Sequence, residues 1–228
     1  MKILAIADIH GDFEKLEELM ERVKEDFDAI VCPGDFTDIG LSAQGFSREE
    51  MLELILEELK SRKKPVLVVP GNHDGKDLHN MFDNSVINLH GDGKIVDGVG
   101  FFGFGGAKTP FQTPFEPSEE ETSQGLAHGW EKIKDCETKI MVVHNPPKNT
   151  KLDQTASGAH VGSEAVRRFI LKNQPTVVIS AHIHEGGRED VLEKTRLVYP
   201  GVAASGCYAI IETGKTLKVE AKTVPLEI

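Results

Sequence analysis

The stretch VLVVPGNHD, residues 66–74, joins an unbroken apolar run to a cluster of polar side chains. Four aliphatic residues in succession predict a short strand that is buried on both faces. A proline–glycine pair ends this strand, and Asn72, His73 and Asp74 follow it directly. A hydrophobic core has no use for such side chains, so the stretch indicates a functional site at the end of a central strand.

The same arrangement recurs after four other apolar runs. These runs are Lys2–Ala7, Ala29–Cys32, Ile140–Val143 and Val177–Ser180. The polar residues that follow them are Asp8 and His10, Asp35, His144 and Asn145, and His182 and His184. Each feature alone has an ordinary interpretation as a turn, a cap or a hydrogen-bonded histidine. Five strands that end in this way favour one crevice at the carboxyl ends of the strands, where α/β sheets bind ligands.

Amphipathic segments between the apolar runs predict helices. Apolar side chains repeat at helical spacing in residues 13–23, 52–59 and 163–173, and Ser47 to Glu50 is a capping box for the second helix. Residues 95–104 predict a hairpin that turns at Asp97-Gly98, and residues 197–224 predict three short strands. We therefore expect an α/β fold, with helices outside and more than one sheet inside, in a single domain over residues 1–228.

Residues 105–129 are the exception to this alternation. They are rich in Pro, Thr, Ser and Glu and show no clear period. Long irregular loops in compact domains are usually functional or mobile. We expect a surface loop here that lies over the site.

Composition and charge exclude several classes of protein. The 228 residues carry a net charge of −11 without an acidic tail, which disfavours general binding to nucleic acids. Cys32, Cys136 and Cys207 lie far apart, so neither a disulfide framework nor a thiolate zinc site is expected. The sequence has no signal-peptide pattern and no apolar stretch of membrane-spanning length. We expect a cytoplasmic protein that does not bind membranes.

The polar residues at the strand ends suit two metal ions better than one. The candidate ligands are Asp8, His10, Asp35, Asn72, His144, His182 and His184. A single zinc site needs about four ligands. Oxygen and nitrogen donors without thiolates suit Mn, Fe, Zn, Co or Ni. If one carboxylate bridges two ions, the remaining ligands divide equally, and such ion pairs act on phosphate esters.

Five motifs in this chain resemble those of the calcineurin-like metallophosphoesterase family. In chain order they are Asp8-x-His10, Gly34-Asp35, Gly71-Asn72-His73-Asp74, His144 and His182-x-His184. The resemblance covers nearly the whole chain and is strongest with the compact prokaryotic branch. It implies a four-layer αββα sandwich, in which two mixed β-sheets are flanked by helices. It also implies two divalent metal ions per chain.

The resemblance assigns a role to each matching residue. Asp8, His10 and His184 would bind the first metal. Asn72, His144 and His182 would bind the second, and Asp35 would bridge the two. His73 would protonate the leaving alkoxide or stabilise charge on the phosphoryl group. Asp74 would hold its imidazole in orientation and raise its basicity.

Two segments bear on the substrate. The segment GDFTDIG, residues 34–40, has no arginine where the Ser/Thr protein phosphatase branch carries Asp-Arg-Gly, which disfavours a phosphoprotein phosphatase. Residues 144–170 resemble an element of other prokaryotic members, and residues 158–163 within them open a predicted helix. Free N–H groups there would receive a phosphate or another anion. His160 is our candidate substrate contact, and Lys148 is a second one.

The resulting hypothesis is a phosphoesterase in which a metal-bound hydroxide attacks a small phosphate ester. Phosphodiesters are favoured because a site without an arginine clamp suits a single negative charge. The alternatives are a phosphomonoesterase, a nuclease, and a non-catalytic metal-binding scaffold for protein interactions. The net charge of −11 disfavours the nuclease. The complete ligand set disfavours the scaffold.

Overall fold

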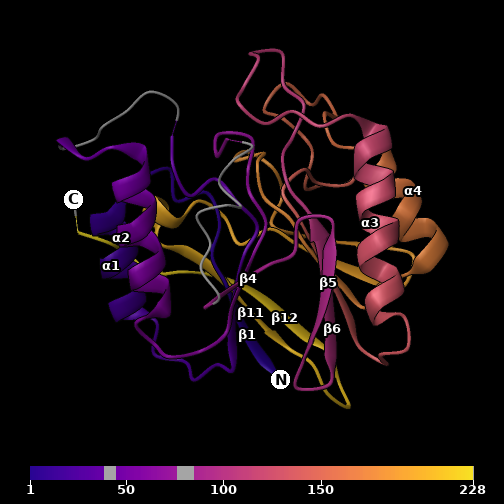
Figure 1. Ribbon diagram of the computed structural model, residues 1–228, viewed down its shortest axis with the longest axis horizontal. Helices are drawn as coiled ribbons and strands as arrows, with labels where there is room; N and C mark the ends of the chain where they lie inside the picture. The colour runs from indigo at the N-terminus through magenta and orange to yellow at the C-terminus, as the bar shows by residue number, and fades with distance from the viewer. Residues whose placement is uncertain (39–44, 76–84, 228) are drawn as a thin grey trace.

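Two mixed β-sheets lie face to face at the centre of the molecule, and helices cover their outer surfaces (Figure 1). The computed structural model describes residues 1–38, 45–75 and 85–227. In spatial order, the first sheet contains β12 (Lys218–Thr223), β11 (Cys207–Glu212), β1 (Lys2–Ala5), β2 (Ala29–Cys32), β3 (Val66–Val68) and β4 (Val86–Asn88). The second contains β5 (Asp92–Val96), β6 (Val99–Phe104), β7 (Lys139–Val143), β8 (Val177–Ile179), β10 (Thr195–Val198) and β9 (Glu189–Leu192).

The helices form the two outer layers. On one side lie α1 (Phe13–Arg22) and α2 (Arg48–Lys60), and on the other lie α3 (Glu119–Ile133) and α4 (Glu164–Asn173), as Figure 1 shows. The strands from β1 to β4 run parallel, whereas β11 pairs antiparallel with both β1 and β12. The predicted αββα sandwich of two mixed sheets is confirmed. Within the described ranges, no helix combines the length and the apolar composition needed to cross a membrane.

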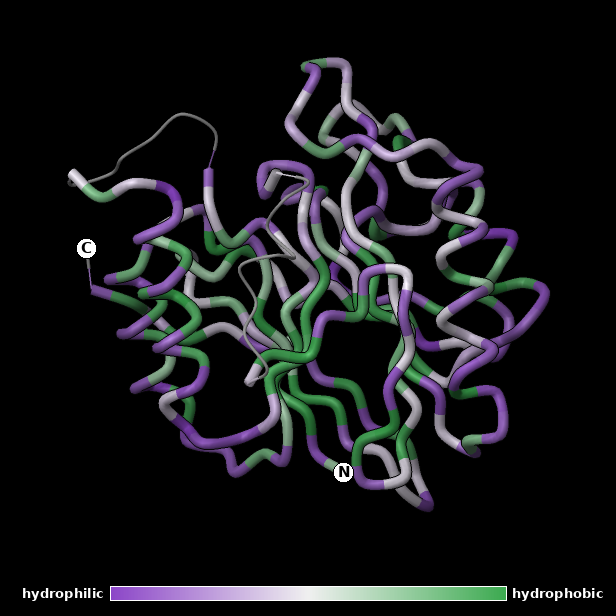
Figure 2. Tube along the Cα trace, in the orientation of Figure 1, coloured by the Kyte–Doolittle hydropathy of each residue, from purple (hydrophilic) through white to green (hydrophobic). Residues whose placement is uncertain are grey.

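Three hydrophobic cores separate the four layers, and β1 shows how a strand serves two of them. Leu4 packs in the core below α1 and α2, whereas Ile3 and Ala5 pack in the core between the two sheets. A third core joins the second sheet to α3 and α4. A strand that contributes to two cores must be apolar on both faces, which explains the unbroken hydrophobic runs. Figure 2 shows these runs as green segments through the centre of the molecule.

The sequence predicted the central strands β1, β2, β3, β7 and β8 and the helices α1 and α4 to within two residues. The capping box that begins α2 is present, with Ser47 Oγ accepting from Glu50 N and Glu50 Oε2 accepting from Ser47 N. The hairpin of β5 and β6 turns at Asp97-Gly98, where both residues have positive φ, as tight hairpin turns favour. The C-terminal segment forms β10, β11 and β12, with a short 3-10 turn at Ala203–Ser205.

The prediction of an irregular loop over residues 105–129 is wrong beyond residue 118. Helix α3 begins there with a second capping box, between Ser118 and Glu121. Its period was hidden because glycines lie where the helix approaches the sheet. A Cβ on Gly125 would lie 2.2 Å from the ring of Phe104, so a larger side chain cannot occupy that position. Small residues on a buried face do not register as a hydrophobic period.

Candidate metal centre and active site

The polar residues that follow the central strands meet at one edge of the sandwich. The regular strands stop two or three residues before several of these side chains: β1 ends at Ala5 and β8 ends at Ile179. The side chains therefore lie on the turns beyond the strands. The structure brings together all seven candidate ligands, in two groups that share Asp35.

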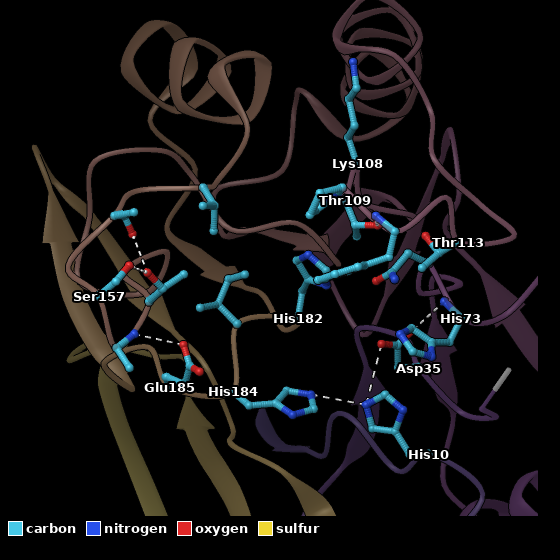
Figure 3. A pocket seen from close by; sticks show the side chains of 18 of the residues that line it. His10, Asp35, His73, Lys108, Thr109, Thr113, Ser157, His182, His184 and Glu185 are labelled. Carbon is cyan, nitrogen blue, oxygen red and sulfur yellow. Dashed lines mark hydrogen bonds and ion pairs between the residues drawn. The ribbon is translucent and has the colours of Figure 1, made fainter.

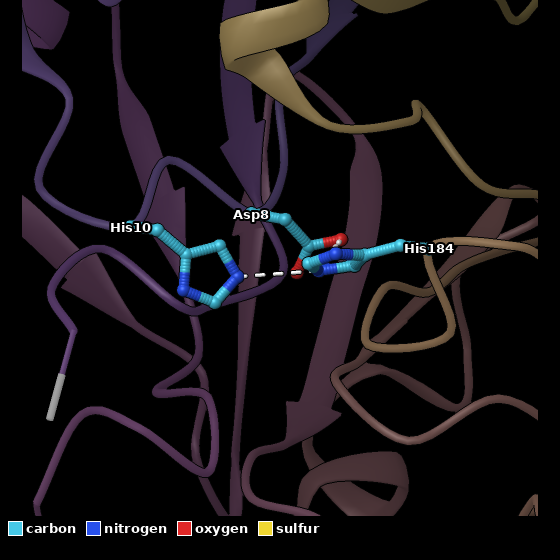
Figure 4. A group of neighbouring side chains, drawn as sticks. All are labelled: Asp8, His10 and His184. Atoms are coloured by element: carbon cyan, nitrogen blue, oxygen red, sulfur yellow. Dashed lines mark hydrogen bonds and ion pairs between the residues drawn. The ribbon is translucent and has the colours of Figure 1, made fainter.

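The first group contains Asp8, His10 and His184 (Figure 4). The two imidazoles face each other, with their Nε2 atoms 3.2 Å apart. His184 Nε2 lies 3.6 Å from Asp8 Oδ2. Asp8 is fully buried, and burial raises the pKa of its carboxyl group, as does the nearby Asp35. The hydroxyl of Tyr199 donates a 2.7 Å hydrogen bond to Asp8 Oδ2 and fixes the carboxylate in this orientation.

The second group contains Asn72, His144 and His182. His144 is fully buried, and its Nδ1 donates to the carbonyl oxygen of Pro33 at 2.8 Å. That bond directs Nε2 towards the centre, 2.8 Å from Asn72 Oδ1. The rings of His144 and His182 lie 5.1 Å apart between centroids. A histidine held through one nitrogen so that the other faces the site is typical of metal ligands.

Asp35 lies between the two groups. Its Oδ2 is 3.7 Å from His10 Nε2 and 3.4 Å from His144 Nε2. Burial alone would raise the pKa of Asp35, but the neighbouring imidazoles outweigh burial and lower it below its usual range. A Cβ on Gly71 would lie 2.0 Å from Asp35 Oδ1, so glycine is required where these two chain segments meet. One carboxylate oxygen thus faces both groups, an arrangement in which a single oxygen could bridge two ions.

Four of the candidate ligands lie on strained backbone. The φ angles lie in the left-handed region that residues other than glycine rarely adopt: they are 51°, 51°, 55° and 79° at Asp8, His10, Asp35 and His182. Such conformations cost about 1–3 kcal/mol each and cluster at functional sites. The fold therefore tolerates local strain in order to aim these side chains inward.

The donor set fits divalent cations. His144 uses its Nδ1 proton on a backbone carbonyl, so the lone pair on Nε2 faces oxygens of Asn72 and Asp35. These electron pairs repel one another unless a positive charge lies between them. Burial lowers the pKa of His144, but the buried Asp35 raises it to about 9 overall, so this carboxylate favours a positive charge beside it, which a proton supplies where no metal is bound. Burial and the neighbouring His144 lower the pKa of His182 to about 3, which keeps that imidazole in its ligand form.

His73 lies beside this centre and is paired with Asp38. Its Nδ1 is 2.7 Å from Asp38 Oδ1, its backbone N–H donates to Asp35 Oδ1 at 2.9 Å, and its ring meets that of His10 edge-on with centroids 5.1 Å apart. Arg48, in the first turn of α2, donates to the carbonyl oxygen of His73. Because Nδ1 is engaged, Nε2 is the nitrogen left for the pocket that His73 lines.

The prediction that Asp74 orients the imidazole of His73 is wrong. Asp74 is fully buried, and its carboxylate accepts from the backbone N–H groups of Gly71, Phe36 and Thr37. Directly consecutive residues on a tight turn point in different directions, and Asp74 points into the turn. It joins the loop after β2 to the loop after β3, whereas Asp38 occupies the place next to His73.

Sequence reasoning missed Asp38 and Tyr199. Asp38 lies in the segment GDFTDIG, three residues after Asp35, and no local pattern marks it. Tyr199 directly follows β10, so it carries the same strand-end signal as the metal ligands. Its ring is buried.

The start of α4 is not open to a substrate anion. Glu119, from the first turn of α3, accepts from the N–H of Ala165 and from the hydroxyl of Ser163, so a carboxylate of the chain already occupies that helix terminus. The ring of His160 pairs with buried Asp153 at 2.7 Å. Lys148 pairs with Glu164 at 3.3 Å. Neither His160 nor Lys148 is among the residues that line the pocket, and a substrate contact by either stays a prediction.

A pocket of about 940 Å³ opens over the centre (Figure 3). Its floor includes His10, Asp35, His182 and His184, and His73 lies at one side. The 105–118 segment lines the pocket through Lys108, Thr109, Pro110, Phe111 and Thr113. This part of the expected loop therefore lies over the site. The 151–162 segment lines it through Thr155, Ala156, Ser157, Ala159 and Val161.

Comparison with known proteins decides the family. A family model described as calcineurin-like phosphoesterase matches residues 1–186. The chain belongs to this family. Uncharacterized protein MJ1162 of Methanocaldococcus jannaschii is 32% identical over 224 residues, which cover 96% of this chain and 95% of that protein. The family uses dinuclear divalent metal sites, and the two groups that share Asp35 are the candidate sites here.

Solved structures support the fold of this calcineurin-like phosphoesterase. TT1561 of Thermus thermophilus superposes with a TM-score of 0.73 at 20% identity, over 97% of this chain and 98% of the other. A dimetal phosphatase from Danio rerio superposes with a TM-score of 0.67 at 12% identity, over 98% and 96%. At these identities the likeness concerns the fold alone.

Proposed function

We propose that this protein hydrolyses phosphate esters at a dinuclear centre, with phosphodiesters as preferred substrates. The observation that carries the proposal is the position of Asp35, whose Oδ2 faces His10 at 3.7 Å and His144 at 3.4 Å. Asp8, His10 and His184 would hold one cation, and Asn72, His144 and His182 the other. The oxygen and nitrogen donors suit Mn²⁺, with Fe, Zn, Ni or Co as alternatives.

Two bound cations would offset the charge of the phosphoryl group and lower the pKa of water. In the hydrolysis, a water oxygen bonds to phosphorus, the ester P–O bond breaks, and the water gives up a proton to solvent. The departing alkoxide needs a proton in exchange.

His73 is the group that supplies this proton. Asp38 at 2.7 Å holds the ring through Nδ1, while Nε2 faces the pocket. After the alkoxide leaves as an alcohol, His73 regains a proton from solvent. A positioned general acid of this kind contributes about 10²–10⁴-fold to the rate.

The charge of the pocket supports a diester as substrate. Among the described residues that line it, Lys108 is the one lysine, and no arginine is present. Arginine frequently binds phosphate through two parallel hydrogen bonds, which favours a dianion. Without such a clamp, the site favours the single negative charge of a diester.

The test uses Mn²⁺-reconstituted protein with a panel of a generic phosphomonoester, a phosphodiester and a cyclic nucleotide. We expect turnover of the diester above that of the monoester, and a loss of about 10²–10⁴-fold in kcat for His73→Ala with unchanged metal content. His128→Ala is the matched control, because His128 is exposed on α3.

Three outcomes would contradict parts of the proposal. Higher turnover of the monoester would reject the diester preference. Full activity of His73→Ala would reject the role of this imidazole. Less than one equivalent of metal, together with no hydrolysis of any ester, would favour the non-catalytic scaffold.

A further inference from the structure

The pocket is larger than a phosphoryl group requires, and part of it is apolar. Its volume of about 940 Å³ lies at the upper end of the range for pockets that enclose a small organic molecule, about 300–1,000 Å³. Beyond the candidate ligands, its lining includes Phe111, Val161 and Ile183. We call these three residues the apolar subsite.

Two members of the apolar subsite are exposed although they are hydrophobic. Among the described residues, six large apolar side chains are more than a third exposed, and Phe111 and Val161 are two of them, at 82% and 44%. They come from different loops, yet both line the same pocket. Exposed apolar side chains that gather at one concave surface mark a place where an apolar partner is bound.

The loop that carries Phe111 is held rigid by Glu116. Its Oε1 accepts from Thr109 Oγ1 at 2.7 Å, from Thr113 N at 2.7 Å and from Thr113 Oγ1 at 2.8 Å. The N–H of Phe115 donates to the carbonyl oxygen of Asn72, a candidate metal ligand. The loop that carries Phe111 is therefore tied through its backbone to the loop that carries Asn72.

The loop that carries Val161 is held in a similar way. The N–H of Val161 donates to the carbonyl oxygen of Asp153, whose buried carboxylate also accepts from Gly162 N. Glu185 Oε2 accepts from the N–H of Ala156 at 2.9 Å and so ties this loop to the residue after His184. Both walls of the pocket are preorganised, which lowers the entropy cost of binding a substituent between them.

The direction of the pocket indicates which part of a substrate it would hold. In Figure 3, His73 and Asp35 lie on one side, Ser157 and Glu185 lie on the opposite side, and His182 and His184 lie between them. The leaving group must lie near His73, which protonates it. The part of the pocket beside the 155–161 segment, which carries Val161, therefore faces the substituent that stays on phosphorus, and Phe111 lines the same pocket from the 105–118 segment.

The charges of the pocket also restrict this substituent. Outside the candidate ligands and the His73–Asp38 pair, its charged residues are Lys108 and Glu185, of opposite sign. Figure 3 shows Lys108 and Glu185 at different ends of the pocket, and Glu185 already accepts a hydrogen bond from the N–H of Ala156. The balance favours an uncharged substituent over a polyanionic one.

We propose that Phe111, Val161 and Ile183 form a specificity subsite for an uncharged, flat aromatic group on the non-leaving side of a phosphodiester. An aromatic ring at Phe111 favours a flat partner, since offset and edge-on ring contacts add to the burial of apolar surface. Val161 and Ile183 supply aliphatic surface for the same group. The inference rests on the proposed phosphoesterase function and names its substrate class.

The test compares two diesters that share one leaving group. Phenyl p-nitrophenyl phosphate and methyl p-nitrophenyl phosphate release the same p-nitrophenolate and differ in the group that stays on phosphorus. We expect kcat/KM for the phenyl ester to exceed that for the methyl ester by about tenfold or more, since a well-formed apolar pocket discriminates by about 10–200-fold. The difference should lie mainly in KM.

Variants of the subsite then test the residues. Phe111→Ala and Val161→Ala should each lower the phenyl-to-methyl ratio of kcat/KM by about three- to tenfold, whereas Phe111→Trp should retain it. Ile95→Ala is the matched control, because Ile95 is 58% exposed on β5 and does not line the pocket. Thermal unfolding of each variant checks that the fold is unchanged.

The outcomes separate this inference from the function on which it rests. If neither diester is hydrolysed by the metal-reconstituted protein, the proposed phosphoesterase function is wrong. If both are hydrolysed but the wild-type ratio is near one, or if the ratio survives in both alanine variants, the function stands and the apolar subsite is rejected.

Discussion

The metal centre and the rim of the pocket, by which we mean the 105–118 and 151–162 segments, differ in burial and in the elements that hold them. At the centre, Asp8, Asn72 and His144 are fully buried, and each lies just beyond a central strand. At the rim, Phe111 is 82% exposed, on a loop that a single carboxylate braces. Strands hold catalytic atoms to narrow tolerances, whereas loops vary at little cost to the core. Under the proposed function, the residues at the strand ends would carry out the reaction and the loops would select the substrate.

The largest expected effect is at the residue shared by both groups. Asp35→Asn removes the negative charge of the carboxylate whose Oδ2 faces His10 and His144. We expect fewer than two equivalents of Mn²⁺ per chain. We also expect kcat to fall by more than the factor of about 10²–10⁴ expected for His73→Ala. Metal analysis after dialysis and kcat on a diester measure these effects.

Asp97→Asn is the control for this change, because Asp97 is exposed in the turn between β5 and β6. Two equivalents of metal and normal turnover in Asp35→Asn would contradict the bridging role and would weaken the contrast between centre and rim.

The next effect separates two aspartates that the sequence places close together. Asp38→Asn keeps the shape of the partner of His73 but removes its charge, so we expect kcat to fall by about 10–100-fold while metal content and stability hold. Asp74→Asn disturbs a buried carboxylate that accepts three backbone N–H groups, so we expect a loss of about 1–3 kcal/mol in the free energy of unfolding.

Urea denaturation and steady-state kinetics on both variants distinguish the two roles. An Asp38→Asn protein with normal kcat, or an Asp74→Asn protein of normal stability, would show that the hydrogen bonds seen here do not define those roles.

A smaller effect is expected one step away from the metals. Tyr199→Phe removes the hydroxyl that donates to Asp8 Oδ2 at 2.7 Å and leaves the buried ring in place. Loss of such an orienting bond typically lowers metal affinity by about 10–100-fold. Competition with a chromophoric chelator measures the affinity. Tyr208→Phe is the matched control, since its hydroxyl lies 3.3 Å from Glu25, outside the site. Equal affinities in the two variants would reject the orienting role of Tyr199.

The difference between centre and rim also explains what sequence reasoning could find. The ligands were predictable because each follows a buried run, and the carboxyl ends of parallel strands meet at one edge. Helix α3 was missed because Gly125 and Gly129 replace the apolar residues of its buried face, although Ser118 and Glu121 form the same capping box that was recognised before α2. The hydrophobic period predicts a helix where apolar side chains recur on its buried face. It fails where close packing requires glycine on that face.

By itself, the sequence determined the central strands, most of the helices, the seven candidate ligands and the family to which their motifs belong. Only the tertiary structure decided that Asp38, and not Asp74, pairs with His73, that Tyr199 orients Asp8, and that Glu119 occupies the start of α4. The physical reason is the range of the interactions. Hydrophobic period and strand-end residues are local features of the chain, whereas a hydrogen bond between residues 8 and 199 exists only after both sheets have formed.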